Sequence, residues 1–289
     1  MIWAPLLSLG AAVGFGVAGV LLRRGLQHAS PLSAAVVSIT VTTAFVWWLA
    51  LLTGPISRVF TWQIWPFLVA GLVAPGLARL MFFVGIDRIG VARAFSLMAT
   101  APLFAVVIAM AFLGERPTPL LLLGAVAIAA GSMLLARRSQ HEARWRRRNM
   151  IFPALGALGF ALRDNLNRWG LRDYGDSLAA AAAATVTSLL VMWICAGAWR
   201  AELHLPRTSL MFFALSGVCE GSAYLLMWRA LAIGDVSVVS PLVNAHSIVA
   251  IALAAIFLRD LERVTWRVVV AAALIVSGVA LVMRGSTGS

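Results

Sequence analysis

The chain has 289 residues, of which 62% are hydrophobic and only 12% are charged, and its mean hydropathy is +0.94. A soluble globular protein carries about 25% charged residues, so this composition excludes that class and predicts a polytopic membrane protein. The net charge of +12 comes entirely from arginines in short clusters between apolar runs, a pattern typical of membrane loops rather than of a nucleic-acid-binding face.

Apolar stretches of about 20 residues follow one another along the chain, which is the length that a helix needs to cross about 30 Å of hydrocarbon. They lie near residues 2–22, 33–53, 62–84, 92–113, 118–136, 150–171, 178–199, 208–230, 236–257 and 266–283. The stretches do not alternate as the strands of a β-barrel do. Arg23-Arg24 follows the first one where a signal peptide would be cleaved, so we expect it to stay in the mature chain.

The first five and the last five stretches share residues at a constant shift of 145 positions. Gly14-Phe15 aligns with Gly159-Phe160, and Phe-Leu-Gly-Glu at 112–115 aligns with Phe-Leu-Arg-Asp at 257–260. Because five is an odd number, the second copy enters the membrane upside down. We therefore predict an all-α integral membrane fold of ten transmembrane helices in two inverted repeats, residues 1–138 and 150–284, with an Arg-rich linker at 139–149.

The five-plus-five layout, Pro102 ahead of Phe-Leu-Gly-Glu at 112–115, and Thr118 followed by a glycine-containing last helix resemble the EamA family of the drug/metabolite transporter superfamily. The resemblance covers nearly the whole chain. It implies a metabolite exporter or exchanger of a bacterial inner membrane, with a central cavity between the halves. The second copy departs from the first, with His246 at the position of Pro102 and Arg259-Asp260 at that of Gly114-Glu115, so we expect an asymmetric site.

Ionisable groups inside the apolar stretches are the first site candidates, because each costs about 3 kcal/mol or more at the bilayer centre. Glu220 lies near the middle of its stretch, and Ser216 and Tyr224 share its helix face. We predict that Glu220 and Tyr224 line a substrate cavity and that Glu220 couples transport to protons. The alternative is a structural carboxylate neutralised by Arg79 or Arg163.

A second cluster, Arg163, Asp164 and Asn167, lies in the sixth stretch. Adjacent residues point about 100° apart on a helix, so we expect Arg163 and Asp164 not to pair, whereas Asn167 shares a face with each of them. We predict that the three side chains line the cavity. The alternative is that the helix ends near Leu162 and the cluster lies in water.

Neutral polar residues of the ninth and fourth stretches complete the predicted substrate site, namely Ser240, Asn244, His246, Ser96 and Thr100. The alternative is that these side chains only hold helices together. Trp228 is a weaker candidate for the cavity wall. We expect Arg79 and Arg229 to extend to the membrane interface, and Cys195 and Cys219 to pack as small apolar residues.

The sequence contains no metal-ligand, nucleotide-binding or hydrolase motif, so we predict neither an enzyme nor a metal or cofactor. Carboxylates at Asp164 and Glu220 with a guanidinium at Arg163 suit a small zwitterion such as an amino acid. One alternative is an organic cation bound by Asp164, Tyr224 and Trp228, with Arg163 held by Glu220; another is a non-transporting scaffold subunit. The expected partners are the lipid bilayer and a small-molecule substrate, without nucleic acid, for a monomer or homodimer in the inner (plasma) membrane.

Membrane orientation yields the first testable prediction. Fifteen arginines lie in loops on the side of the 139–149 linker and six on the other side. The excess predicts a cytoplasmic linker with both termini outside, whereas the EamA resemblance suggests the reverse. A cysteine introduced at Ser139, after Cys195 and Cys219 are replaced by alanine, should not react with a membrane-impermeant reagent added to intact cells. Labelling from outside would reverse the orientation.

Overall fold

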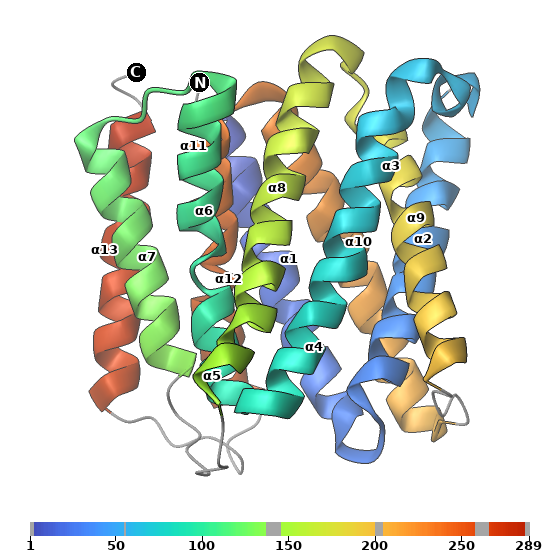
Figure 1. The fold of residues 1–289 in the computed structure, drawn as a ribbon, viewed down its shortest axis with the longest axis horizontal. Coiled ribbons are helices and arrows are strands. Elements are labelled where there is room, and N and C mark those ends of the chain that lie inside the picture. The colour runs from blue at the N-terminus through green and yellow to red at the C-terminus, as the bar shows by residue number, and fades with distance from the viewer. Residues whose placement is uncertain (1–2, 55, 137–145, 200–204, 258–265, 287–289) are drawn as a thin grey trace.

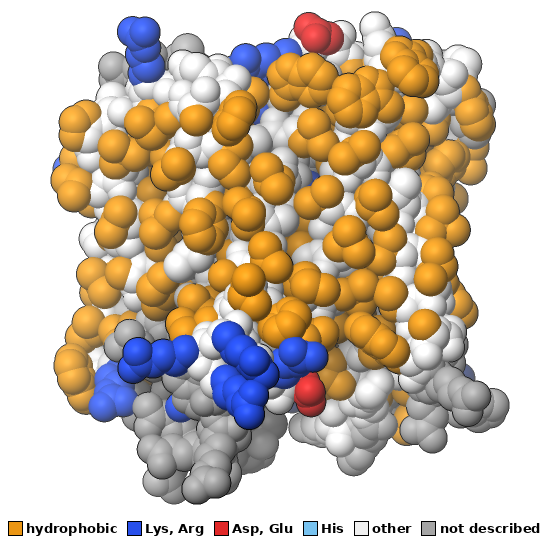
Figure 2. All heavy atoms as spheres, viewed as in Figure 1, with side chains coloured by type: hydrophobic (Ala, Val, Ile, Leu, Met, Phe, Trp, Pro, Cys, Tyr) orange, Lys and Arg blue, Asp and Glu red, His pale blue; other side chains and the backbone are white. Residues whose placement is uncertain are grey.

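The computed structural model describes residues 3–54, 56–136, 146–199, 205–257 and 266–286, and these residues form a bundle of long helices without strands. The start of the first helix and the end of the last lie at the same end of the bundle (Figure 1). Exposed apolar side chains cover its middle, and arginines gather toward the ends (Figure 2). The chain is a multi-pass membrane protein.

The first half contains two unbroken long helices, two broken ones and a shorter last helix. Helix α1 spans Trp3–Gly25 and α2 spans Pro31–Thr53. The third stretch is divided into α3 (Trp65–Gly71), a π-helical turn (Leu72–Leu77) and α4 (Ala78–Ile89). The fourth is divided into α5 (Val91–Met98), α6 (Ala101–Ile108) and a π-helical turn (Ala109–Leu113), and α7 follows over Pro119–Ala136.

The second half has the same plan. It contains α8 (Ile151–Tyr174), α9 (Ser177–Ala198), α10 (Arg207–Ile233), α11 (Val236–Asn244), α12 (His246–Phe257) and α13 (Trp266–Ser286). Short 3-10 turns cover Leu26–His28, Ile56–Phe60, Trp62–Ile64 and Arg147–Met150.

Eight helical segments in the described part of the chain are long and apolar enough to cross a membrane, and α7 contains a shorter apolar helix. Helix α8 falls outside this group because its second half carries five charged residues, Arg163, Asp164, Arg168, Arg172 and Asp173. The segments lie where the hydropathy pattern predicts them. That all ten cross the membrane stays a prediction.

Most helix–helix contacts recur when each helix is replaced by its counterpart in the other half of the chain. Helix α1 packs on α10 as its counterpart α8 packs on α4, and α2 packs on α10 as α9 packs on α3. Helix α1 also packs on α12 as α8 packs on α6, and the equivalent pairs α2 and α9, and α7 and α13, pack on each other. This exchange symmetry agrees with two copies of one five-segment unit.

The direction of the helices agrees with inversion of the second copy. Gly25 lies against Phe213 and Gly10 against Leu226, so α1 runs antiparallel to α10. Arg163 contacts Tyr224 and Arg168 contacts the Leu231 carbonyl, so α8 runs parallel to α10. The equivalent helices α1 and α8 therefore run in opposite directions, as an inverted repeat requires.

The break between α3 and α4 has a local cause. Ala74 has extended dihedral angles (φ −151°, ψ 135°), and Pro75 has no N–H to donate to the Gly71 carbonyl one turn earlier. Ser188 of α9 donates to that carbonyl instead, at 2.8 Å. Such a replacement is needed inside a membrane, where no lipid group can make the bond.

Glu115 joins the two halves near the other broken helix. Its buried carboxylate accepts hydrogen bonds from the backbone N–H groups of Val236 and Ser237, at 2.8 and 2.9 Å. These are unpaired donors of the first turn of α11, and the negative charge also favours this helix end. The equivalent Asp260 of the second copy lies outside the described residues.

Candidate functional site

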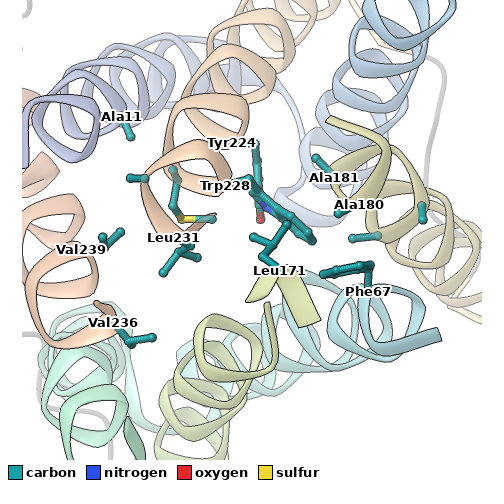
Figure 3. Packing of buried hydrophobic residues seen from close by; sticks show 14 of the residues in the cluster. Ala11, Phe67, Leu171, Ala180, Ala181, Tyr224, Trp228, Leu231, Val236 and Val239 are labelled. Carbon is teal, nitrogen blue, oxygen red and sulfur yellow. The ribbon is translucent and has the colours of Figure 1, made fainter. Parts of the chain in front are cut away.

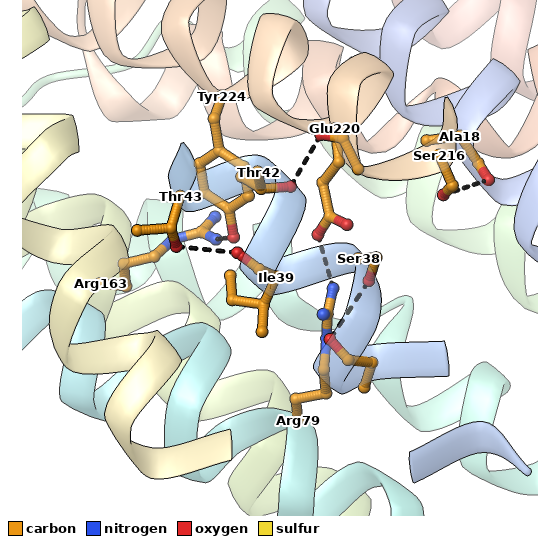
Figure 4. Close-up of polar contacts among 12 residues, drawn as sticks. Ala18, Ser38, Ile39, Thr42, Thr43, Arg79, Arg163, Ser216, Glu220 and Tyr224 are labelled. Atoms are coloured by element: carbon orange, nitrogen blue, oxygen red, sulfur yellow. Dashed lines mark hydrogen bonds and ion pairs between the residues drawn. The ribbon is translucent and has the colours of Figure 1, made fainter. Parts of the chain in front are cut away.

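Glu220 forms an ion pair with Arg79 in the interior of the bundle. Arg79 Nη2 donates to Glu220 Oε1 at 2.6 Å, joining α4 to α10 (Figure 4). The expectation that Arg79 extends to the interface is therefore wrong. Arg79 is the second residue of the helix that begins after the break at Ala74 and Pro75, and from there its long side chain reaches Glu220 of α10. Arg229, in contrast, is exposed.

Arg163 and Asp164 form a second ion pair within α8. Arg163 Nε and Nη2 both donate to Asp164 Oδ1, at 3.0 and 2.7 Å. The expectation that these neighbours do not pair is wrong, because the long arginine side chain bends back around the helix to the short carboxylate. Both residues are buried and α8 continues to Tyr174, so the alternative of a helix end near Leu162 is also wrong.

Tyr224 of α10 connects this second pair to the helix that carries Glu220. Arg163 Nη1 donates to the Tyr224 hydroxyl at 3.2 Å, and the guanidinium lies over the Phe160 ring, 4.9 Å from its centroid. Glu220 precedes Tyr224 by one turn. Arg163 therefore pairs with Asp164 and not with Glu220, which removes the premise of the organic-cation alternative.

The four charged groups balance one another. Two guanidinium groups and two carboxylates come from α4, α8 and α10. Figure 4 shows Arg163 and the Arg79–Glu220 pair on either side of Tyr224. Removing such ions from water costs several kcal/mol each unless partners compensate. The pairing lets the four groups lie between apolar helices.

Ser216, which shares the helix face of Glu220 and Tyr224, contacts a different neighbour. Its hydroxyl donates to the Ala18 carbonyl of α1 at 2.9 Å. It therefore helps to hold α1 against α10.

The predicted residues of the ninth stretch lie at the junction of α11 and α12. Ser240 is buried, and Asn244 and His246 are partly buried. The Phe15 ring lies 5.4 Å from the Tyr224 ring and 6.3 Å from the His246 ring, between their centroids. The Phe15 ring therefore lies between His246 and Tyr224, the residue to which Arg163 donates.

Ser96 and Thr100 of the first half donate to backbone carbonyls. Ser96 Oγ donates to Met133 O of α7 at 3.4 Å, and Thr100 Oγ1 donates to Leu97 O at 2.6 Å. Both bonds stabilise the region around the break between α5 and α6. Their role in substrate binding stays a prediction.

A small cavity adjoins Tyr224 on the side of α9, with room for about one water molecule. Its walls come from α10, α9, α2 and the broken turn between α3 and α4. They consist of Tyr224, Trp228, Ala181, Ala184, Thr185, Ser188, Ala74, Pro75 and Ile39. The cavity therefore touches both the helix break and the helix that bears Glu220.

Arg79 is named in the sequence analysis as a possible partner of Glu220, which the ion pair confirms, but is not selected there for the substrate site. Two features of the sequence point to an interior role for Arg79. Its charge lies inside an apolar stretch, where it is costly, and Pro75, four residues earlier, predicts a break in the helix. Treating residues 62–84 as one straight helix placed Arg79 too close to the membrane surface.

The family model described as the EamA-like transporter family matches residues 2–137 and 148–284, one copy in each half. A solved structure titled "Crystal structure of protein" has a TM-score of 0.82 and 18% sequence identity, covering 99% of this chain and 98% of that one. At this identity the likeness concerns the fold alone. Comparison with curated proteins gives no match.

The buried pair between Arg79 and Glu220 can be tested by neutralisation. Arg79→Met should lower the free energy of unfolding by about 3 kcal/mol, because it leaves Glu220 buried without a partner. Combining it with Glu220→Gln should recover most of the loss. The measurement is denaturant unfolding of purified protein in detergent.

Arg58→Met is the matched control, since it breaks the 3.0 Å pair with Asp176 in which Arg58 is 59% exposed. This loss should be at most about 1 kcal/mol. Equal small losses for Arg79→Met and Arg58→Met would contradict a stabilising buried pair.

Proposed function

The chain belongs to the EamA-like transporter family, and on that premise we propose that it moves a small zwitterionic metabolite, such as an amino acid, by alternating access. The proposed location is the inner (plasma) membrane, for a monomer or homodimer with ten membrane crossings. The family is one of transporters rather than enzymes, and we infer no catalytic role and no cofactor.

The observation that carries the substrate class is the presence of two ion pairs between the helices, the partly buried pair of Arg79 with Glu220 and the buried pair of Arg163 with Asp164. A zwitterion can replace each partner by a group of the same sign. Its ammonium takes the place of a guanidinium at a carboxylate, and its carboxylate takes the place of Asp164 at Arg163. The displaced Arg79 and Asp164 carry opposite charges, so the net charge of the low-dielectric interior stays unchanged.

An organic cation fits this arrangement less well. It would add a net positive charge to a site whose two guanidinium groups and two carboxylates already balance, which is costly between apolar helices. Its sequence-based rationale also required Arg163 to be held by Glu220, whereas Arg163 is paired with Asp164.

Alternating access is supported by the placement of the pairs between inverted halves. Arg79 belongs to the first half, and Arg163, Asp164 and Glu220 belong to the second. Broken helices at Ala74 and Ala245 adjoin them, and such breaks are common at transporter binding sites. Relative movement of the halves would separate Arg79 from Glu220 and open the site.

A ligand screen tests the substrate class. Purified protein should be stabilised against thermal unfolding by an amino acid more than by amines or organic anions at equal concentration, because only bound ligand shifts the unfolding equilibrium. Arg163→Ala should lose this ligand-induced shift, whatever its own melting temperature.

Tightest binding of a carboxylate-free amine that is insensitive to Arg163→Ala would contradict the zwitterion assignment. A scaffold subunit would show no stabilisation by any of the three classes.

Proton coupling through Glu220 forms the second part of the proposal. Glu220→Gln should abolish pH-gradient-driven uptake of the best ligand into proteoliposomes, because glutamine cannot exchange a proton. A cooperative thermal unfolding transition of the variant should report a folded protein. Asp87→Asn, at an exposed carboxylate near the end of α4, is the control and should transport normally. Unchanged pH-driven flux in Glu220→Gln would exclude this role.

A further inference from the structure

Asn167 and Trp228 are buried polar side chains without hydrogen-bond partners in the described structure. Neither amide atom of Asn167 nor the indole Nε1 of Trp228 is bonded, and the side chains belong to residues that are 0% and 1% exposed. An unsatisfied polar group in an apolar interior costs about 1–3 kcal/mol, and surrounding lipid cannot compensate. Buried groups of this kind call for a ligand or an ordered water.

The two side chains lie at the same level of the membrane, on neighbouring parallel helices. Arg163 of α8 bonds to Tyr224 of α10. Five residues further along α8, Arg168 bonds to the carbonyl of Leu231, which lies seven residues beyond Tyr224 on α10. Interpolating between these contacts places Asn167 within one turn of Trp228 along the bundle.

This level adjoins the charged site. Asn167 lies one turn beyond Arg163 on α8, and Trp228 lies one turn beyond Tyr224 on α10, which is about 6 Å along each helix. Tyr224 and Trp228 both line the small cavity, which has room for about one water molecule. With a hydrogen bond at each end, the ammonium group and the short polar side chain of an amino acid can bridge groups that lie one helix turn apart.

The unsatisfied atoms define the chemistry of the group that would bind there. The indole of Trp228 only donates, whereas the amide of Asn167 both donates and accepts. A hydroxyl or a carboxamide meets both demands at once. Arg168 lies at this level with its Nη atoms bonded to Asp235 and to the Leu231 and Ala232 carbonyls, while its buried Nε is unbonded. Trp228 packs among Phe67 and Leu171 (Figure 3), and these apolar surroundings favour an uncharged polar group over a further full charge.

We propose that Asn167 and Trp228 form a subsite for the uncharged polar side chain, a hydroxyl or a carboxamide, of the transported zwitterion. The inference rests on the proposed function and extends it from the charged groups of the substrate to its side chain.

Shape-matched ligand pairs test the subsite. Apparent affinities are measured by thermal stabilisation of the full-length protein with threonine against valine and with asparagine against leucine. The polar member of at least one pair should bind about tenfold more tightly, which is the worth of one to two hydrogen bonds. Asn167→Leu and Trp228→Phe should each reduce that ratio to near one while leaving binding of the apolar member unchanged.

Asn165→Leu is the matched control. Asn165 is a buried amide on the same helix, but its Nδ2 donates to the Ala105 and Ala161 carbonyls on another face. This substitution should alter the melting temperature and leave the ligand ratio intact. Trp228→Phe keeps the ring packing and provides the test even where Asn167→Leu does not fold.

The outcomes separate the two proposals. Equal binding of polar and apolar members, or a ratio that survives both substitutions, overturns the subsite and leaves the zwitterion assignment standing; a structural water alone would give this result. Stabilisation only by amines or by organic anions overturns the zwitterion assignment and the subsite with it.

Discussion

A bilayer offers no hydrogen bonds, so every polar group between the helices of this protein must be satisfied by another protein group, water or a ligand. The arrangement of the site follows from that constraint. Ser188 compensates the carbonyl that Pro75 leaves unpaired, and Glu115 caps the first turn of α11. The four charges at the centre occur as two pairs for the same reason.

Helix breaks bring the site together. In a regular α-helix without the extended Ala74, Arg79 would lie on a different face of the third helix. The break changes the direction of the side chains that follow it, and the guanidinium of Arg79 in the first half reaches the carboxylate of Glu220 in the second. The same π-helical turn forms part of the wall of the cavity beside Tyr224. One local irregularity thus contributes both a charge and space for a ligand.

Polar groups in the interior fall into two kinds. Those with partners, such as Ser216 with Ala18, hold helices together and explain the packing of the closed bundle. Those without partners, Asn167 and Trp228, have no such structural explanation among the described residues. Because burial is costly for both kinds, the second kind points to recognition of a solute rather than to a scaffold role.

The sequence by itself determined the membrane class, the positions of the helical segments, the repeat and the family, because hydropathy and spacing are local properties that lipid enforces along the chain. It also identified Arg163, Asp164, Glu220 and Tyr224 as interior groups, since charges in apolar runs are conspicuous. Only the tertiary structure decided their partners. The pairing of Glu220 with Arg79 depends on a break that re-aims a helix, and that of Arg163 with Asp164 depends on how a long side chain bends within a packed interior.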